Sequence, residues 1–397
     1  MVDAAVTHWG KARAVAGFRA FSMLGSELTV FALVLRERGH GATFVSILLA
    51  AGTVSMIAMV PIAGWIADRF STKQIIPFTS TLQAALIVSL IYQHNMFLIT
   101  ITVFLSSSCG AIENPAFMAL MPTLVAPEDF NKQMGFAQTL YALAGLAAPA
   151  FGGVLVAQTG YKTPFVIDAI TFVILAFAPT MLGVDRKSEA ANAGEKIKAS
   201  DGMKFIFQNR YLRALAILIS AFLFAAGTLS IANLFLLTKV LHTSVFIFGL
   251  SGAASALGMI MGGILLMQIT VQVSQQPKAI AFVLAGTALC IIGMSFAGHW
   301  SIVLILDLIL GVLIAILTNL ISTIFIQRSP SAMRGRIGAA LNAFINLGMI
   351  GALLISGPLI DWLGTRKLLL VAGIAALIIL ALFGPAIFHG ELPAAEE

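Results

Sequence analysis

Long runs of hydrophobic residues, separated by short polar segments, recur along the whole of this 397-residue chain. Each run has the roughly 20 residues that an α-helix needs to cross the hydrocarbon core of a bilayer. Lipid offers no hydrogen-bond partner to an open backbone, so single runs of this kind form helices. The pattern predicts an all-α integral membrane protein with twelve transmembrane helices, at residues 14–35, 43–66, 75–92, 97–120, 134–156, 164–182, 214–237, 245–269, 279–297, 301–325, 337–360 and 368–388.

The longest polar segment divides these runs into six and six. We therefore expect an N-terminal six-helix half at 1–182, a cytoplasmic linker at 183–213 and a C-terminal six-helix half at 214–397. A short interfacial helix is expected at 202–213, inside the linker. Proline and glycine signals recur in the two halves at an offset of about 203 residues, as expected for parallel repeats with a substrate site between them. The recurring pairs are Pro127 with Pro330 and Gly160 with Gly364.

The composition excludes a water-soluble protein. Hydrophobic residues make up 59% of the chain and charged residues 10%, whereas soluble domains average about 25% charged residues. The mean hydropathy is +0.99. The first hydrophobic run is too long for a signal peptide and contains Arg19 and Glu27, so we expect it to be the first transmembrane helix.

The distribution of Lys and Arg predicts the orientation in the membrane. Sixteen of the 23 Lys and Arg residues lie in segments on the side of the N-terminus and six on the other side, while Arg19 lies inside the first run. Positive residues concentrate in cytoplasmic loops, so we expect both termini in the cytoplasm of a bacterial cell with the chain in the inner membrane. The net charge of +6 follows from this topology, and we expect no nucleic-acid partner.

A polar turn between the second and third runs carries the most specific motif. Gly64 is followed four residues later by Asp68 and Arg69, and then by Lys73. This spacing resembles the signature between helices 2 and 3 of the major facilitator superfamily. The resemblance implies two pseudo-symmetric six-helix halves, transport by alternating access, and a turn that acts as a latch for one conformer. The expected partners of the latch cations lie in the next cytoplasmic loop, at Glu128 and Asp129.

Three further segments extend the resemblance. Residues 113–129 and 327–336 resemble one branch of this superfamily, which includes macrolide efflux proteins and siderophore exporters. That branch implies efflux of amphiphilic small molecules. The arginine that drug/proton antiporters of the family often carry in helix 4 is absent from residues 105–110. The third segment resembles the antiporter motif of helix 5, although tight helix packing explains the same small residues; it comprises Ala144, Ala148, Pro149, Gly152 and Gly153.

Few acids lie inside the hydrophobic runs, and each is a candidate functional group because a charge is costly in lipid. Glu27 lies near the middle of the first run, and we expect it to couple protons or to recognise substrate. Alternatively, Glu27 and Arg19, about two turns away, help to neutralise each other. Glu113 and Asn114 either line the transport cavity or anchor the end of their helix. Asp307 is a second candidate for coupling or binding.

Other polar groups in the runs have structural interpretations. Asp168 lies near the end of its run and close to Lys162, so we expect it at the membrane interface. The two cysteines, Cys109 and Cys290, are expected to be small apolar fillers. The neutral amides are expected to form hydrogen bonds between helices; they are Gln83, Gln138, Asn233, Asn319, Asn342 and Asn346.

The chain has no nucleotide-binding loop, no metal-binding cluster of His and Cys, and no catalytic motif. We expect no cofactor, no metal and no enzymatic activity. The sequence predicts a secondary active transporter that exports amphiphilic small molecules in exchange for protons and works as a monomer in the bilayer. A flippase for lysophospholipid-type amphiphiles, and a uniporter or importer of a small solute, are alternatives with the same fold.

Overall fold

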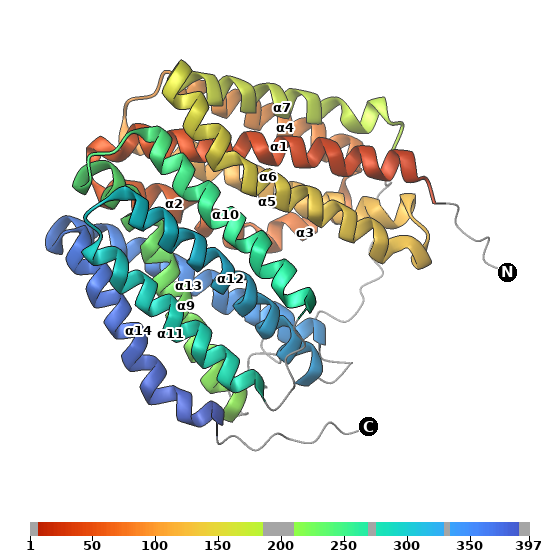
Figure 1. The fold of residues 1–397 in the computed structure, drawn as a ribbon. Coiled ribbons are helices and arrows are strands. Elements are labelled where there is room, and N and C mark those ends of the chain that lie inside the picture. The colour runs from red at the N-terminus through yellow and green to blue at the C-terminus, as the bar shows by residue number, and fades with distance from the viewer. Residues whose placement is uncertain (1–6, 186–209, 269–274, 329–333, 389–397) are drawn as a thin grey trace. The chain divides into compact units, whose positions relative to one another are not determined.

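The computed structural model describes residues 7–185, 210–268, 275–328 and 334–388, which are helical apart from short connections (Figure 1). Most of the expected linker, and with it most of the expected interfacial helix, lies outside the described residues.

The chain forms two compact units. The first comprises Met1–His40 and Ile47–Gly194, and the second comprises Gly41–Ser46 and Glu195–Glu397. The first turn of the second helix therefore belongs to the second unit, and the rest of that helix belongs to the first.

In the first unit, α1 packs along α6 and α7, and α4 packs along α5 and α7 (Figure 1). α3 lies against α5. The helices are α1 (Trp9–Glu37), α2 (Ala42–Ala58), α3 (Val60–Arg69), α4 (Thr72–Leu90), α5 (Met96–Leu124), α6 (Phe130–Thr159) and α7 (Lys162–Met181).

In the second unit, α10 packs along α12, α11 along α12 and α14, and α9 along α13 and α14. α9 continues into a π-helical turn at Leu236–Val240. The helices are α9 (Arg210–Phe235), α10 (Val245–Gln268), α11 (Gln276–Phe296), α12 (Trp300–Arg328), α13 (Arg334–Leu363) and α14 (Thr365–Phe388).

The helices match the predicted spans one to one. Within the described residues, nine helices are long and apolar enough to cross a membrane, and the bent pair α2 and α3 makes ten. The helices α4 and α9 occupy the two remaining predicted positions, 75–92 and 214–237. The predicted all-α membrane fold with twelve helices is confirmed.

One predicted helix, at 43–66, is not continuous. It bends by 50° between Ala58 and Val60, where α2 ends and α3 begins. Pro61 lies in the first turn of α3. Since proline has no backbone N–H and clashes with the preceding turn, the hydrogen-bond ladder is interrupted at this point.

The polar turn that was predicted at 64–73 is much shorter than expected. Residues 64–69 continue α3, and only Phe70 and Ser71 separate it from α4. Ser71 and Gln74 form a capping box at the start of α4, in which each side chain bonds the other residue's backbone N–H. The motif residues Gly64, Asp68 and Arg69 are therefore helical, which places them at fixed angles around α3.

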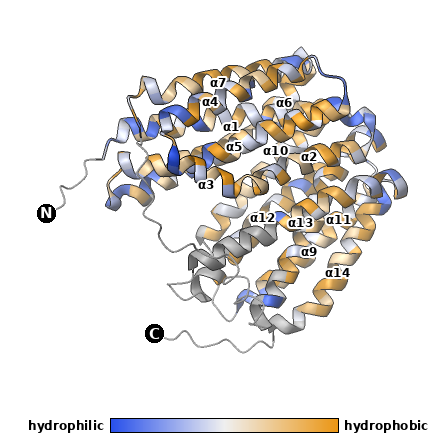
Figure 2. Cartoon of the chain, turned by 180° about the vertical axis from the view of Figure 1, so that it is seen from behind, coloured by the Kyte–Doolittle hydropathy of each residue, from blue (hydrophilic) through white to orange (hydrophobic). Residues whose placement is uncertain are grey.

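Large hydrophobic side chains cover the outside of the helices, as expected for a surface in contact with lipid. Trp362 is 79% exposed and Phe282 is 76% exposed. Figure 2 shows the helices mostly in hydrophobic colours, with hydrophilic colours concentrated toward their ends. Packing inside each unit therefore depends on close contact and on polar groups rather than on hydrophobicity alone.

Glycines bring α10 and α12 into backbone contact in the second unit. A Cβ atom at Gly311 would overlap the carbonyl oxygen of Ser255, and one at Gly258 would overlap that of Leu308. Small residues allow this approach in membrane helices because no side chain separates the backbones. Larger residues at these two positions would force α10 and α12 apart.

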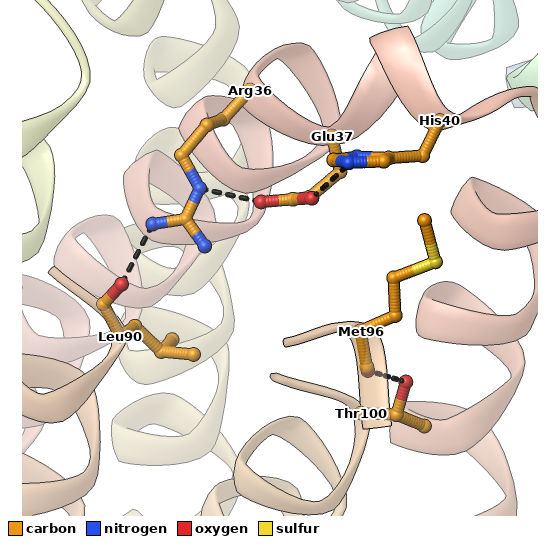
Figure 3. A network of polar contacts seen from close by, with 6 residues as sticks. All are labelled: Arg36, Glu37, His40, Leu90, Met96 and Thr100. Carbon is orange, nitrogen blue, oxygen red and sulfur yellow. Dashed lines mark hydrogen bonds and ion pairs between the residues drawn. The ribbon is translucent and has the colours of Figure 1, made fainter. Parts of the chain in front are cut away.

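A buried carboxylate closes the end of α1 in the first unit (Figure 3). Glu37 accepts a hydrogen bond of 2.6 Å from Arg36 Nε through Oε1, and its Oε2 lies 3.0 Å from His40 Nδ1. Arg36 Nη1 also donates to the carbonyl oxygen of Leu90, at the end of α4, at 2.7 Å. This network fixes the ends of α1 and α4 to each other.

In the second unit, Asp361 near the end of α13 caps the first turn of α2. Its carboxylate accepts hydrogen bonds from the backbone N–H groups of Ala42 and Thr43, at 3.0 and 2.9 Å. The Thr43 hydroxyl donates a third, at 2.6 Å. The first N–H groups of a helix have no partner within the helix, so a carboxylate from another helix satisfies them here.

Candidate functional site

Two neighbouring cavities lie among the helices of the first unit. The larger has a volume of about 690 Å³ and is lined by α1, α2, α3, α4, α5 and α7. The smaller has a volume of about 240 Å³ and lies among α1, α2, α4, α5 and α7. They share a wall that is formed by Ser26, Glu27, Met56, Gln83 and Gly110.

Arg19 of α1 lines the larger cavity and lies between two aromatic rings. Its guanidinium carbon is 4.8 Å from the ring centroid of Phe117 and 5.2 Å from that of Tyr141, within the range of cation–π attraction. Its Nη2 donates a hydrogen bond of 2.7 Å to Asn114 Oδ1. The structure thus brings Arg19 and Asn114 together, while no ion pair within 4 Å joins Arg19 to Glu27.

Glu113 of α5 also borders the larger cavity, and it fixes α5 to α4. Its Oε1 accepts three hydrogen bonds, from the hydroxyls of Thr79 and Ser80 at 2.7 Å each and from Gln83 Nε2 at 2.9 Å. The residue is buried. Glu113 therefore ties α5 to α4 at a position inside α5 and borders the cavity, while its role in transport stays a prediction.

Glu27 lies in the wall that the two cavities share, and its side chain is exposed there. Within the described part of the chain it makes no hydrogen bond or ion pair. A carboxyl group without a fixed partner, next to space that a ligand or water can enter, is able to exchange protons. Its placement near the middle of α1, as predicted, allows contact with both cavities.

Asp168 of α7 is fully buried against α1, while its expected depth near the membrane interface stays a prediction. The glycine at position 25 permits this contact, because a Cβ on Gly25 would lie 2.8 Å from Asp168 Oδ1. That oxygen accepts long hydrogen bonds of 3.4 Å from the hydroxyls of Ser26 and Thr171. Lys162 is six residues away on the same helix, which places it on a different face.

Asp307 joins three helices of the second unit. The Nδ2 of Asn233, on α9, donates to both of its carboxylate oxygens at 3.2 Å. The Ser251 hydroxyl, on α10, donates a hydrogen bond to Oδ2. Asp307 is buried, so the acid and the amide that the sequence suggested separately form one interhelical cluster.

The residues of the expected latch have other neighbours in this structure. The Arg69 guanidinium lies over the Trp65 ring, 4.4 Å from its centroid. The backbone N–H of Lys73 donates to Asp185 Oδ1 at 3.2 Å. The expected partners of these two cations are Glu128 and Asp129. All four residues are described, and no ion pair within 4 Å joins either cation to either carboxylate.

Gly64 and Asp129 have further contacts that the sequence did not suggest. Gly64 lines the larger cavity, so the motif reaches from the end of α3 to the cavity wall. Asp129 accepts a hydrogen bond of 2.8 Å from the hydroxyl of Thr7, before α1. Asp68 is exposed at the end of α3.

The small residues of α6 form a packed face. A Cβ at Gly152 would lie 2.8 Å from Cδ1 of the Phe31 ring on α1. Pro149 lies inside α6 without ending the helix. The packing explanation for this motif is therefore observed in the structure, where the buried positions are Ala144, Ala148, Gly152 and Gly153.

Sequence reasoning did not identify the groups that surround Asp168. Ser26 and Thr29 are three residues apart on α1 and so share a face of the helix. A glycine beside two hydroxyl residues and an acid, at positions 25–29, was a local signal of a polar packed face. The aromatic rings around Arg19 carried no comparable signal, because Phe117 and Tyr141 lie on two other helices.

A bundle of apolar helices that encloses a cavity with charged and polar walls is the architecture of a membrane transport protein. The sequence profile of the Major Facilitator Superfamily matches residues 15–353, and the chain belongs to this superfamily. The protein is accordingly a multi-span transporter of the cell membrane, in a family of transporters rather than enzymes, and it binds small-molecule substrates.

Named relatives support the predicted branch. Macrolide efflux protein A of Streptococcus pyogenes is 23% identical over 370 residues, which cover 89% of this chain and 90% of that protein. The staphyloferrin A transporter of Staphylococcus aureus is 25% identical over 239 residues, which cover 58% and 59% of the two chains. The resemblance to macrolide efflux proteins and siderophore transporters is confirmed.

Solved structures share the fold. A bacterial homolog of the human lysosomal transporter Spinster, in an inward-facing and unoccupied conformation, has a TM-score of 0.75 at 12% identity and covers 96% of this chain and 97% of its own. The nucleoside transporter NupG has a TM-score of 0.70 at 12% identity and covers 95% and 98%. At such low identity these structures show the fold alone.

Proposed function

We propose that this protein exports amphiphilic small molecules from the cytoplasm in exchange for protons, by alternating access, as a monomer with both termini in the cytoplasm. The observation that carries the proposal is the larger cavity, in which a cation, a carboxyl group without a fixed partner and an apolar wall face the same space.

The cavity has the size and chemistry for an amphiphile. Its volume of about 690 Å³ lies within the range of roughly 300–1,000 Å³ that is typical of small-molecule sites. Met23, Met56 and Met118 contribute flexible, polarisable surface that adapts to different apolar shapes. Arg19 and Glu27 provide one charge of each sign, so the wall can orient a polar or charged end of the substrate.

Glu27 is the proposed proton-coupling group. It lies exposed in the cavity wall and has no partner that would hold it in one protonation state. A proton that binds Glu27 in one conformer and leaves in the other would link the proton gradient to the conformational change. Asp307 is a weaker candidate for this role because its carboxylate is already bound by Asn233 and Ser251.

The motif at the end of α3 is the proposed latch. Its charges, Asp68, Arg69 and Lys73, are exposed in this structure, and we propose that the two cations pair with carboxylates in another conformer. Their proposed partners are Glu128 and Asp129. These pairs are not formed in this structure, so we assign them to the other conformer. Because these charges lie outside the cavity wall, we expect them to affect the conformational equilibrium rather than substrate affinity.

Transport into inverted membrane vesicles tests the proposal, with a macrolide, a catecholate and a lysophospholipid as separate probes. Uptake of an amphiphilic probe should require this protein and should collapse when a protonophore is added. Vesicles without the protein give the background. Uptake that persists undiminished with the protonophore would contradict proton coupling, and transport of the lysophospholipid alone would indicate a flippase.

A further inference from the structure

Three buried side-chain oxygen atoms of the first unit have no hydrogen-bond partner in the described part of the chain, namely Asp168 Oδ2, Thr29 Oγ1 and Gln133 Oε1. The first two belong to neighbouring helices, α7 and α1. Asp168 is fully buried and Thr29 is 5% exposed. Both line the smaller cavity, next to Ser26 and Glu27. Buried polar atoms in proteins are nearly always paired, so this wall is incomplete without a group that binds both oxygens.

The other donors around Asp168 are already engaged. The Thr171 hydroxyl donates to the Asp168 carbonyl oxygen at 2.7 Å, and the Ser26 hydroxyl reaches Oδ1 only at 3.4 Å. The Thr29 hydroxyl lies close enough to interact with the same carboxyl group, but the two groups do not meet hydrogen-bond geometry. These contacts orient the carboxyl group toward α1 but leave one of its oxygens unpartnered.

Among the described residues of the first unit, no Lys or Arg side chain forms an ion pair with this carboxylate. Arg19 is held by Asn114 and the two aromatic rings. Arg36 bonds Glu37 and the Leu90 carbonyl group. An unpaired carboxylate in a membrane-spanning bundle carries a large desolvation cost, and a bound cation would remove it.

We propose that a monovalent metal cation, sodium, binds in the smaller cavity of the first unit. Its ligands are the side-chain oxygens of Asp168, Thr29, Ser26 and Glu27. Every group in this set is an oxygen ligand, and oxygen is the ligand that hard cations prefer. Asp168 is the one fully buried acid of the set, and a single positive charge balances it. Magnesium would fit less well, because it retains several waters and demands octahedral geometry.

The competing occupant is a proton. A proton on Asp168 could be shared with the Thr29 hydroxyl, but it would not need a cavity of about 240 Å³ or a second carboxyl group beside it. Glu27 is the charged group that interacts with Asp168 from α1. α4 contributes a neutral residue, Gln83, to both cavities. Besides Asp168, α7 carries one charged residue, Lys162, at its first position.

The site adjoins the proposed transport cavity, since Ser26 and Glu27 line both cavities. A bound cation would therefore change the electrostatic surroundings of Glu27, and protons and sodium would compete for the same pair of acids. Binding itself does not depend on the proposed export function, whereas this effect on coupling does.

Binding of radioactive sodium to the purified full-length protein, in detergent and without substrate, tests the site. Choline chloride keeps the ionic strength constant. We expect saturable binding near pH 8, weaker apparent affinity as the pH is lowered, and a sodium-dependent rise in the unfolding temperature. Because no transport is measured, a failure of the export proposal would leave this result unaffected.

Four variants give the controls. Asp168→Asn should abolish sodium binding, and Thr29→Val, which keeps the acid, should weaken it several-fold. Asp307→Asn changes a buried acid in the second unit and should bind sodium normally. Ser22→Ala removes a buried hydroxyl from α1 that lines only the larger of the two cavities, and it should also bind normally.

Two results would overturn the proposal. One is the absence of saturable sodium binding by the wild-type protein near pH 8. A rise in unfolding temperature on acidification that Asp168→Asn abolishes, without any sodium effect, would then identify Asp168 as a protonation site alone. The other is sodium binding that is unchanged in both single variants, Thr29→Val and Asp168→Asn. If Asp168→Asn does not fold, unchanged sodium binding in Thr29→Val is enough to overturn the proposal.

Discussion

Arg19 is bound by Asn114 and not by Glu27. Its Nη2 lies 2.7 Å from Asn114 Oδ1, and its guanidinium group is held between the rings of Phe117 and Tyr141. Arg19 thus has partners of its own on α5 and α6. Arg19 and Glu27 can therefore be changed separately, which makes the role of Glu27 testable.

Glu27→Gln should fold and insert normally and should lose the pH dependence of transport. The amide keeps the shape of the protonated acid, and Arg19 loses no direct partner in the change. We expect the unfolding temperature to stay near that of the wild type, measured in detergent, and transport in vesicles to become insensitive to pH. A stable variant with unchanged pH dependence would remove Glu27 from the coupling mechanism.

Asn114→Leu is the matched control for this experiment. It removes the hydrogen-bond acceptor of Arg19 and leaves a partly buried guanidinium group less well satisfied. It should lower the unfolding temperature, whereas Glu27→Gln should not. If Glu27→Gln lowers it as much as Asn114→Leu does, the acid has a structural role in holding α1.

Glu113→Ala should destabilise the first unit strongly. The change removes the acceptor of three hydrogen bonds from α4 and leaves the Ser80 hydroxyl and the Gln83 amide buried without it. We expect a loss of about 2–4 kcal/mol in the free energy of unfolding, from two buried donors at about 1–2 kcal/mol each.

Thermal or denaturant unfolding in detergent measures this effect, with Glu113→Gln as the conservative comparison. The glutamine keeps a carbonyl oxygen that can accept from the same donors, so its effect should be smaller. Equal stability of Glu113→Ala and the wild type would show that the contacts with α4 contribute little.

The sequence was sufficient for the helices because a run of about 20 apolar residues has few alternatives in lipid. It also carried the signal for the bend, Pro61, which lies where α3 begins. The burial of Asp168 had no such signal in the residues next to Asp168 itself. It depends on a contact with Ser26 across 142 residues of sequence and on the missing side chain at Gly25.

The candidate site was predictable only in part for the same reason. Charged residues inside apolar runs stand out, so Glu27, Arg19 and Glu113 were found. Their partners come from other helices, and the pairing depends on helix rotation and packing that hydrophobicity does not specify. Arg19 consequently pairs with Asn114, although Glu27 on its own helix was the partner considered from the sequence.

Asp68→Asn should reduce the rate of transport more than substrate affinity. Asp68 lies exposed at the end of α3, and it is not among the residues that line the larger cavity. A latch residue changes the balance between conformers, so turnover should fall while the binding constant measured in detergent changes little. Asp68→Glu, which keeps the charge, should retain more activity; binding that weakens in proportion to the transport rate would contradict the latch.

A reporter that is active only in the cytoplasm, fused after Glu397, should be active. The reason is the excess of Lys and Arg in the segments on the side of the two termini, 16 against six. A fusion in the polar connection near residue 160, which is predicted on the outer side, is the matched control and should be inactive. Activity from the control but not from the terminal fusion would reverse the orientation.

Asp361→Ala should loosen the start of α2. The carboxylate accepts from the N–H groups of Ala42 and Thr43 and from the Thr43 hydroxyl, and the loss of a helix cap costs about 0.5–2 kcal/mol. Because Asp361 holds the first turn from another helix, amide hydrogen exchange at residues 42 and 43 should accelerate. Thr43→Val removes only the hydroxyl and should have a smaller effect of the same sign. Unchanged exchange in Asp361→Ala would mean that the cap does not hold this turn in solution, and that the helix start is satisfied in another way.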